Sequence, residues 1–115
     1  MNQEETVEIS LSELISHSIK ELTKVTREAQ NHVVDRDVEA YELKELIKNS
    51  YQLADSVFSI AEKNQALLTP DQLYKIDDAY SACRFMYTAS NRCPGEVDLF
   101  QFIQDYSMSD SDEQI

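Results

Sequence analysis

Apolar residues recur every three or four positions over most of the 115-residue chain. Because an α-helix turns once in 3.6 residues, this spacing gathers the apolar side chains on one face of each helix. The pattern predicts three long helices at about 10–34, 37–63 and 70–91, and a short fourth helix at about 96–106. The stripe of the first helix consists of Leu11, Leu14, Ile15, Ile19, Leu22, Val25, Ala29 and Val33.

Two of the predicted helix starts carry capping signals. Ser10 precedes Glu13 by three residues, which is the spacing of a capping box, so Ser10 is the predicted N-cap of the first helix. Thr69 precedes Gln72 at the same spacing, and Pro70 suits the first position of a helix. The third helix is therefore expected to begin at residue 70.

The other boundaries rest on single features. Asp35 and Asp37 are the two candidate N-caps of the second helix, because a short carboxylate side chain can accept from the first free N–H groups. Pro94-Gly95 ends the third helix. The segment that follows alternates at Phe100 and Phe102, so a strand is the alternative there, although the acids that open the segment favour a helix.

The fold class that follows is all-α, a small antiparallel bundle of three long helices and a short C-terminal one. A single glycine and two prolines leave few residues for the tight turns of a β domain. We expect one helical-bundle domain at 10–106. The acidic segments 1–9 and 107–115 are too polar to bury themselves and are predicted to be disordered.

The net charge of −12 is unevenly distributed. Residues 1–9 and 96–115 hold nine of the twelve excess negative charges, and the segment between them is only mildly acidic. Direct nucleic-acid binding is not expected, because phosphate contacts need clustered Lys and Arg. An alternative function is nucleic-acid mimicry, in which carboxylates imitate phosphates. The protein would then inhibit a DNA- or RNA-binding protein, as small proteins encoded by phages and mobile elements do. The compact candidate face for such mimicry is Asp37, Glu39, Glu42 and Glu45.

The chain shows no motif that predicts a catalytic site, a metal site or a cofactor, and we expect none of the three. Cys83 and Cys93 have neither the close spacing of a zinc or redox pair nor a neighbouring histidine, so they are interpreted as free thiols. No signal peptide and no apolar run of membrane-spanning length is visible, and a soluble, cytoplasmic protein without membrane contact is therefore expected.

One short motif suggests chemistry. Arg27-Glu28-Ala29-Gln30-Asn31-His32 resembles the Arg-x4-6-His motif of the HEPN helical-bundle ribonucleases, in which such a pair acts on an RNA phosphodiester. The likeness covers six residues, and it implies a ribonuclease with Arg27 and His32 as its catalytic pair. Glu28 departs from the family pattern, which commonly has Asn, Asp or His after the arginine. A ribonuclease is thus the remote alternative, and a solvated helix face is the simpler interpretation.

Aromatic and thioether side chains are concentrated in the last third of the chain. Three of them are consecutive, and because successive residues of a helix point about 100° apart, the three cannot all face one core. The leading hypothesis is a non-enzymatic interaction module, namely an adaptor, a small chaperone or an inhibitor that binds another protein or forms a homodimer. The expected surface is Phe85, Met86, Tyr87, Phe100, Phe102 and Tyr106.

Overall fold

The computed structural model describes the backbone of residues 3–113 and the side chains of residues 11–106. The described chain contains four α-helices and one turn of 3-10 helix, and no strand is present within residues 3–113, so the all-α prediction is confirmed. The elements are α1 (Gln3–Asp35), α2 (Ala40–Lys63), η1 (Gln65–Leu67), α3 (Pro70–Arg92) and α4 (Leu99–Glu113).

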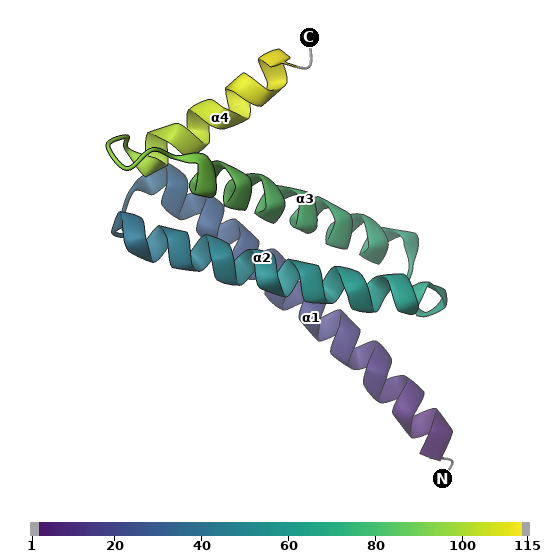
Figure 1. Cartoon of the computed structure of the whole chain (residues 1–115). Helices are drawn as coiled ribbons and strands as arrows, with labels where there is room; N and C mark the ends of the chain where they lie inside the picture. Colours follow the sequence, from purple (N-terminus) through teal and green to yellow (C-terminus); the bar gives the residue numbers. More distant parts are fainter. Residues whose placement is uncertain (1–2, 114–115) are drawn as a thin grey trace.

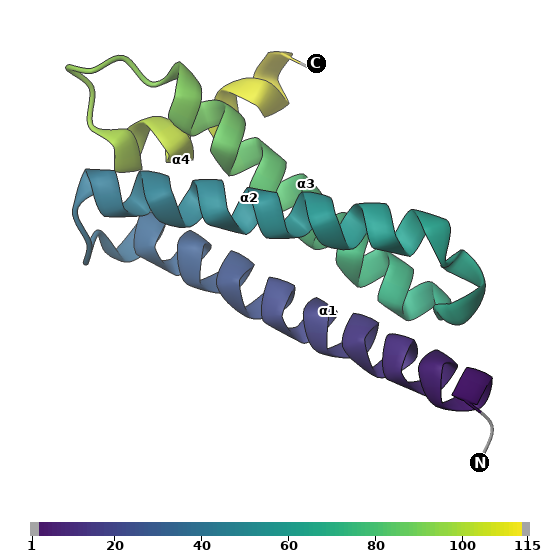
Figure 2. The ribbon, with the colours of Figure 1, turned by 60° about the horizontal axis from the view of Figure 1, so that its bottom comes forward.

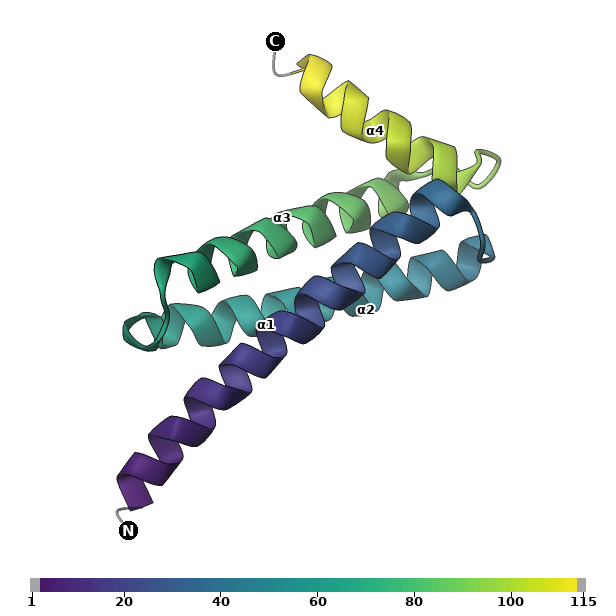
Figure 3. The same cartoon turned by 180° about the vertical axis from the view of Figure 1, so that it is seen from behind.

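The three long helices run up and down, and α4 lies across one end of them (Figure 1). α2 and α3 form an antiparallel pair, and α1 crosses this pair obliquely, as the view from behind shows (Figure 3). The C-terminal half of α1 packs against both helices (Figure 2), whereas its N-terminal end diverges from the α2–α3 pair (Figures 1 and 3). The molecule is elongated, with extents of 60 × 33 × 19 Å.

Two clusters of buried residues make up the core. The first joins the middle of α1 to α2 and α3, and its fully buried members include Leu22, Ala54 and Cys83. The second lies at the α4 end, where Leu43 and Ile47 of α2 meet α4 residues such as Ile103. Burial of these side chains supplies the main favourable free energy of folding, and the second cluster is what attaches α4 to the bundle.

The Thr69 capping box is confirmed. The Thr69 hydroxyl accepts from the Gln72 backbone N–H at 3.1 Å, and the Gln72 side chain accepts from the Thr69 N–H at 2.9 Å. Pro70 occupies the first turn of α3, as predicted. The helix extends to Arg92, one residue past the predicted end near residue 91.

Two predicted N-caps are wrong. Ser10 lies inside α1, which begins at Gln3, because the acids that precede Ser10 suit the positive end of a helix dipole and let the helix start earlier. Helix α2 begins at Ala40 with Glu39 as its N-cap, and no side chain caps it. Asp35 is instead the last residue of α1, and Asp37 lies two residues before the N-cap position, where its carboxylate accepts from His32 Nδ1 at 2.5 Å.

Helix α4 also differs from its predicted range of 96–106. Asp98 is its N-cap, since the Asp98 carboxylate accepts from the Phe100 N–H at 3.1 Å, and the helix continues to Glu113. The predicted disorder of the two ends is also wrong for most of their length. The backbone is helical at residues 3–9 and 107–113. Residues 1–2 and 114–115 lie outside the described part of the chain.

Candidate functional site

The six residues of the predicted aromatic surface lie together but are largely used for packing. Met86 and Phe100 are buried in the second core cluster, so their assignment to an exposed surface is wrong. The other four are half-buried: Tyr87 stacks on Tyr51 of α2 at a centroid distance of 4.7 Å, and Phe85 packs against Tyr106 at 5.3 Å. Packing of α3 against α2 and α4 covers these side chains, which periodicity within one helix could not reveal.

The exposed apolar side chains are found elsewhere, and two of them border a groove between α1 and α2. Leu14 is 57% exposed and Ile60 is 40% exposed. The groove has a volume of about 440 Å³ and is mostly apolar. We call it the outer groove; its lining residues are Leu11, Leu14, Ile15, Ser18, Val57, Ile60 and Asn64.

The outer groove lies on the side of α1 and α2 that α3 does not cover. On α2, Tyr51 and Phe58 face α3, where they stack on α3 tyrosines. Ile60 follows Phe58 by two residues, so it points about 200° away from it. The apolar character continues toward the middle of the helix pair through the half-buried Leu53 and Val25. These residues and the outer groove together form one apolar strip along α1 and α2, which is longer than the groove alone.

Acidic residues interrupt this strip on α1, where Glu21 lies between Leu14 and Val25, and continue it on α2 toward the α1–α2 connection. Glu21 lies two helical turns beyond Leu14 on the same face of α1, and Glu42 lies five turns before Ile60 on α2. Glu42 and its neighbour Glu45 are exposed. These two belong to the predicted mimic face, all four members of which are exposed. Only two of the four, however, lie on the regular surface of α2, because Asp37 is bonded to His32 and Glu39 is the N-cap.

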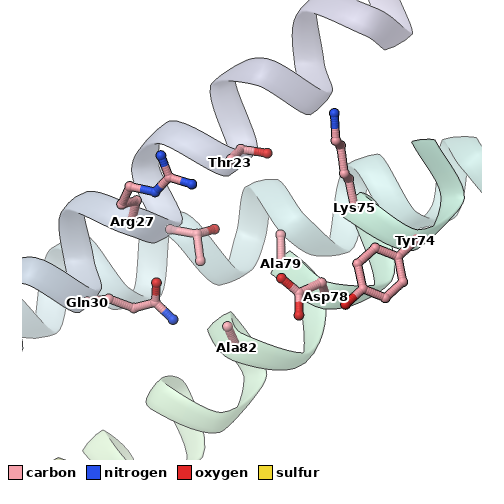
Figure 4. Close-up of a pocket in the computed structure, with 9 residues that line it drawn as sticks. Thr23, Arg27, Gln30, Tyr74, Lys75, Asp78, Ala79 and Ala82 are labelled. Atoms are coloured by element: carbon pink, nitrogen blue, oxygen red, sulfur yellow. The ribbon is translucent and has the colours of Figure 1, made fainter. Parts of the chain in front are cut away.

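A second, polar hollow lies between α1 and α3 and has a volume of about 210 Å³ (Figure 4). Arg27 and Gln30 extend into it from α1, and the Asp78 carboxylate and Tyr74 face it from α3 (Figure 4). Lys75 lies at its edge. Its floor is apolar and small, formed by Ala79 and Ala82 with the buried Thr26.

This hollow adjoins a wider one of about 420 Å³ along the outside of α1. The two share Thr23, Arg27 and Lys75, and the wider one adds Lys20 and Lys24. We call the combined feature the cationic hollow. Lys20, Lys24 and Arg27 are close together on α1, but Lys75 lies about fifty residues further along the chain on α3, so the sequence pattern did not reveal the combined hollow.

Arg27 and His32, the pair in the ribonuclease-like motif, have different surroundings. Arg27 lines the cationic hollow, and His32 lines neither part of it. Instead, the His32 ring donates to Asp37 just after α1, and this contact lowers the pKa of the Asp37 carboxyl. The structure thus places the two side chains in separate environments.

Within the described residues, no three His, Cys, Asp or Glu side chains are close enough together to hold a metal ion. Both cysteines are free thiols; Cys83 is buried with its Sγ 3.2 Å from the Thr26 hydroxyl, and burial raises the pKa of this thiol. Among the described helices, none combines the length and the apolarity that crossing a membrane requires. Comparison of the chain with protein families, with curated proteins and with solved structures finds no match.

Proposed function

We propose that this protein is a non-enzymatic interaction module of the cytoplasm, and that its outer groove binds an amphipathic helix of a partner protein. The outer groove carries the proposal, because Leu14 and Ile60 are exposed beside an apolar groove of about 440 Å³. A helix laid along α1 and α2 would bury these side chains, as a fourth helix does in a bundle. The cytoplasmic location is supported by two cysteines that are free thiols, Cys83 within α3 and Cys93 just after its end.

The charge pattern along the strip specifies the partner further. The strip is apolar around Leu14 and Ile60 and acidic around Glu21, Glu42 and Glu45. From Ile60 back to Glu42 it spans 18 residues, or about 27 Å of helix. A matching helix has apolar residues at i, i+3, i+4 and i+7 over one half and Lys or Arg over the other half. Opposite charges would then meet at the acidic end.

A second copy of the chain fits this strip poorly. Two strips aligned in the same direction would place acids against acids, which is repulsive. Two strips aligned in opposite directions would place the glutamates of each copy against Leu14 and Ile60 of the other, which would desolvate charge without a counter-ion. A partner with its own cationic segment avoids both costs.

The proposal is tested by selecting from a displayed library of amphipathic helical peptides of about 18 residues against the full-length protein. The polar positions of the library vary freely between acidic, basic and neutral residues. We expect enriched peptides to be apolar over one half and basic over the other. A Leu14→Asp/Ile60→Asp protein should bind them at least about tenfold more weakly, because it places charges in the apolar half of the strip.

The matched control is Val34→Asp/Val97→Asp, which puts the same charges on two exposed apolar residues outside the outer groove. It should bind the enriched peptides like the unmodified protein. Equal binding by the groove variant, or enrichment without any apolar periodicity, would contradict the proposal. A homodimer in sedimentation that Leu14→Asp/Ile60→Asp dissociates would show that a second copy occupies the groove and would also overturn it.

A further inference from the structure

The cationic hollow concentrates positive charge on an otherwise acidic molecule. Its lining includes four of the ten Lys and Arg residues of the chain and two acids, Glu28 and Asp78. Four cations and two carboxylates give the lining a charge of +2, or +1 if Asp71, which pairs with Lys75, is counted, whereas the whole chain carries −12. Like charges held at one place repel each other, so this arrangement favours the binding of an anion. The four cations are Lys20, Lys24, Arg27 and Lys75.

The donors that could hold an anion can be identified from the hydrogen bonds of the hollow. Thr23 and Thr26 donate their hydroxyl hydrogens to backbone carbonyls one turn earlier in α1, at 2.9 and 2.7 Å. Their hydroxyl hydrogens are therefore already used. An anion in the hollow would accept hydrogen bonds from the charged side chains and the Gln30 amide. Lys75 pairs with Asp71 at 3.2 Å, but this is an exposed contact within one helix and is weak. Arg27 presents a planar set of N–H donors, which suits the oxygens of a phosphate group.

The α3 side of the hollow has a different chemistry. Tyr74 is 69% exposed and offers a ring face to an organic group, and Ala79 and Ala82 provide a small apolar floor. The Asp78 carboxylate faces the same space and can accept a hydrogen bond (Figure 4). A ligand with a phosphate at one end and an organic, hydrogen-bond-donating group at the other fits both halves.

We infer that the cationic hollow binds a small phosphate ester, with the phosphate beside Arg27 and Lys75 and the organic part against Tyr74. A long polyanion fits less well, because the cations are confined to one hollow and the remaining surface is acidic and repels an extended chain of phosphates. A dianionic phosphate group also accepts hydrogen bonds from more donors than a carboxylate does, and the hollow offers several cationic donors. This inference is independent of the proposed helix-binding function, since the outer groove shares no residue with the hollow.

The test uses phenyl phosphate as the probe, with inorganic phosphate and benzoate as comparisons, in NMR titrations of the full-length protein at low salt. We expect phenyl phosphate to bind most tightly and to shift the backbone amide signals around Arg27 and Lys75. Arg27→Gln/Lys75→Gln should weaken binding of both phosphates by at least about tenfold, because two charge-assisted contacts are lost. Tyr74→Ala should weaken phenyl phosphate alone.

The matched control is Lys44→Gln/Lys48→Gln, which removes the same charge from two exposed lysines of α2 that do not line the hollow. It should leave phenyl phosphate binding unchanged. The inference is overturned if the control weakens binding as much as Arg27→Gln/Lys75→Gln does, if benzoate binds as tightly as phenyl phosphate, or if phenyl phosphate causes no shifts at millimolar concentration. All substituted residues are exposed, and circular dichroism checks that the helices are intact.

Discussion

The Arg36 guanidinium donates to the Asp98 carboxylate across 62 positions of sequence, and so joins the α1–α2 connection to the first residue before α4. The same guanidinium donates to Gln101 at 2.9 Å and lies 5.7 Å from the centre of the Phe100 ring. Arg36 has φ = 55°, in the left-handed region, where its N–H closes α1 by donating to the His32 carbonyl. One side-chain pair thus connects the residue that ends α1 to the residue that caps α4.

Replacement of Asp98 by Asn should loosen α4 while leaving the three long helices folded. The substitution removes the charge that Arg36 contacts, although the amide can still accept from the Phe100 N–H. Hydrogen exchange should become several-fold faster at the α4 amides and should stay unchanged in the middle of α2. Gln104→Ala is a useful comparison, since it removes another contact of α4, the 3.1 Å bond to the Val33 carbonyl. Unchanged α4 protection in Asp98→Asn would mean that burial alone holds this helix.

Acid should weaken the same contact. The Arg36 guanidinium and the Phe100 N–H hold the pKa of Asp98 below its ordinary value of 3.8, and His32 lowers the pKa of Asp37 in the same direction. A depressed carboxyl pKa stabilises the fold above the unfolded-state pKa, and this contribution is lost as the pH falls through the folded-state value. Stability to urea should therefore decline below about pH 4. Asp37→Asn/Asp98→Asn should show a shallower decline, and an identical slope in both proteins would refute this assignment.

The Thr69 box offers a direct test of helix capping. Thr69→Ala should lower the free energy of unfolding by about 1 kcal/mol, because the Gln72 N–H loses its partner at the start of α3. Ser10→Ala is the matched control, since Ser10 has the same sequence signature but lies within the helical backbone of α1. It should be neutral or slightly stabilising, as alanine has the higher helix propensity. Urea denaturation measures both, and a comparable loss in Ser10→Ala would indicate that α1 begins at Ser10 after all.

Leu22 is the most completely buried of the α1 side chains in the first core cluster. It is completely buried, so Leu22→Ala should cost about 2–5 kcal/mol of unfolding free energy through lost burial and the cavity left behind. Leu14→Ala truncates the same side chain on the same helix, where it is mostly exposed, and should cost well under half as much. Chemical denaturation distinguishes the two, and equal losses would place Leu14 in the core.

The two cysteines should differ in reactivity toward a thiol reagent. Cys93 is partly exposed and should react with a disulfide reagent within minutes. Cys83 should react only as fast as the bundle opens, because it is buried and burial raises the pKa of its thiol, which lowers the fraction of the reactive thiolate. Cys93→Ser isolates the slow phase, and urea should accelerate it. A fast reaction of Cys83 in the folded protein would contradict its place in the core.

Local sequence patterns determined which segments are helical and where one of them starts. Apolar spacing identified the three long helices, because a 3.6-residue period is a property of one helix on its own, and the acids after Pro94-Gly95 favoured a helix over a strand for the fourth. The Thr69 box was predictable for the same reason, since every atom of it lies within four residues. At Ser10 an equally good local signal failed, because the helix had already begun upstream at Gln3.

The functional surfaces were decided only by the packing of helices against one another. Met86 and Phe100 became core residues when α4 docked across the end of the bundle, and Leu14 and Ile60 stayed exposed because no helix covers that side of α1 and α2. The cationic hollow formed where Arg27 of α1 and Lys75 of α3 came together. A periodic stripe shows that one face of a helix is apolar, but whether another helix covers that face depends on tertiary contacts, which no single segment of sequence contains.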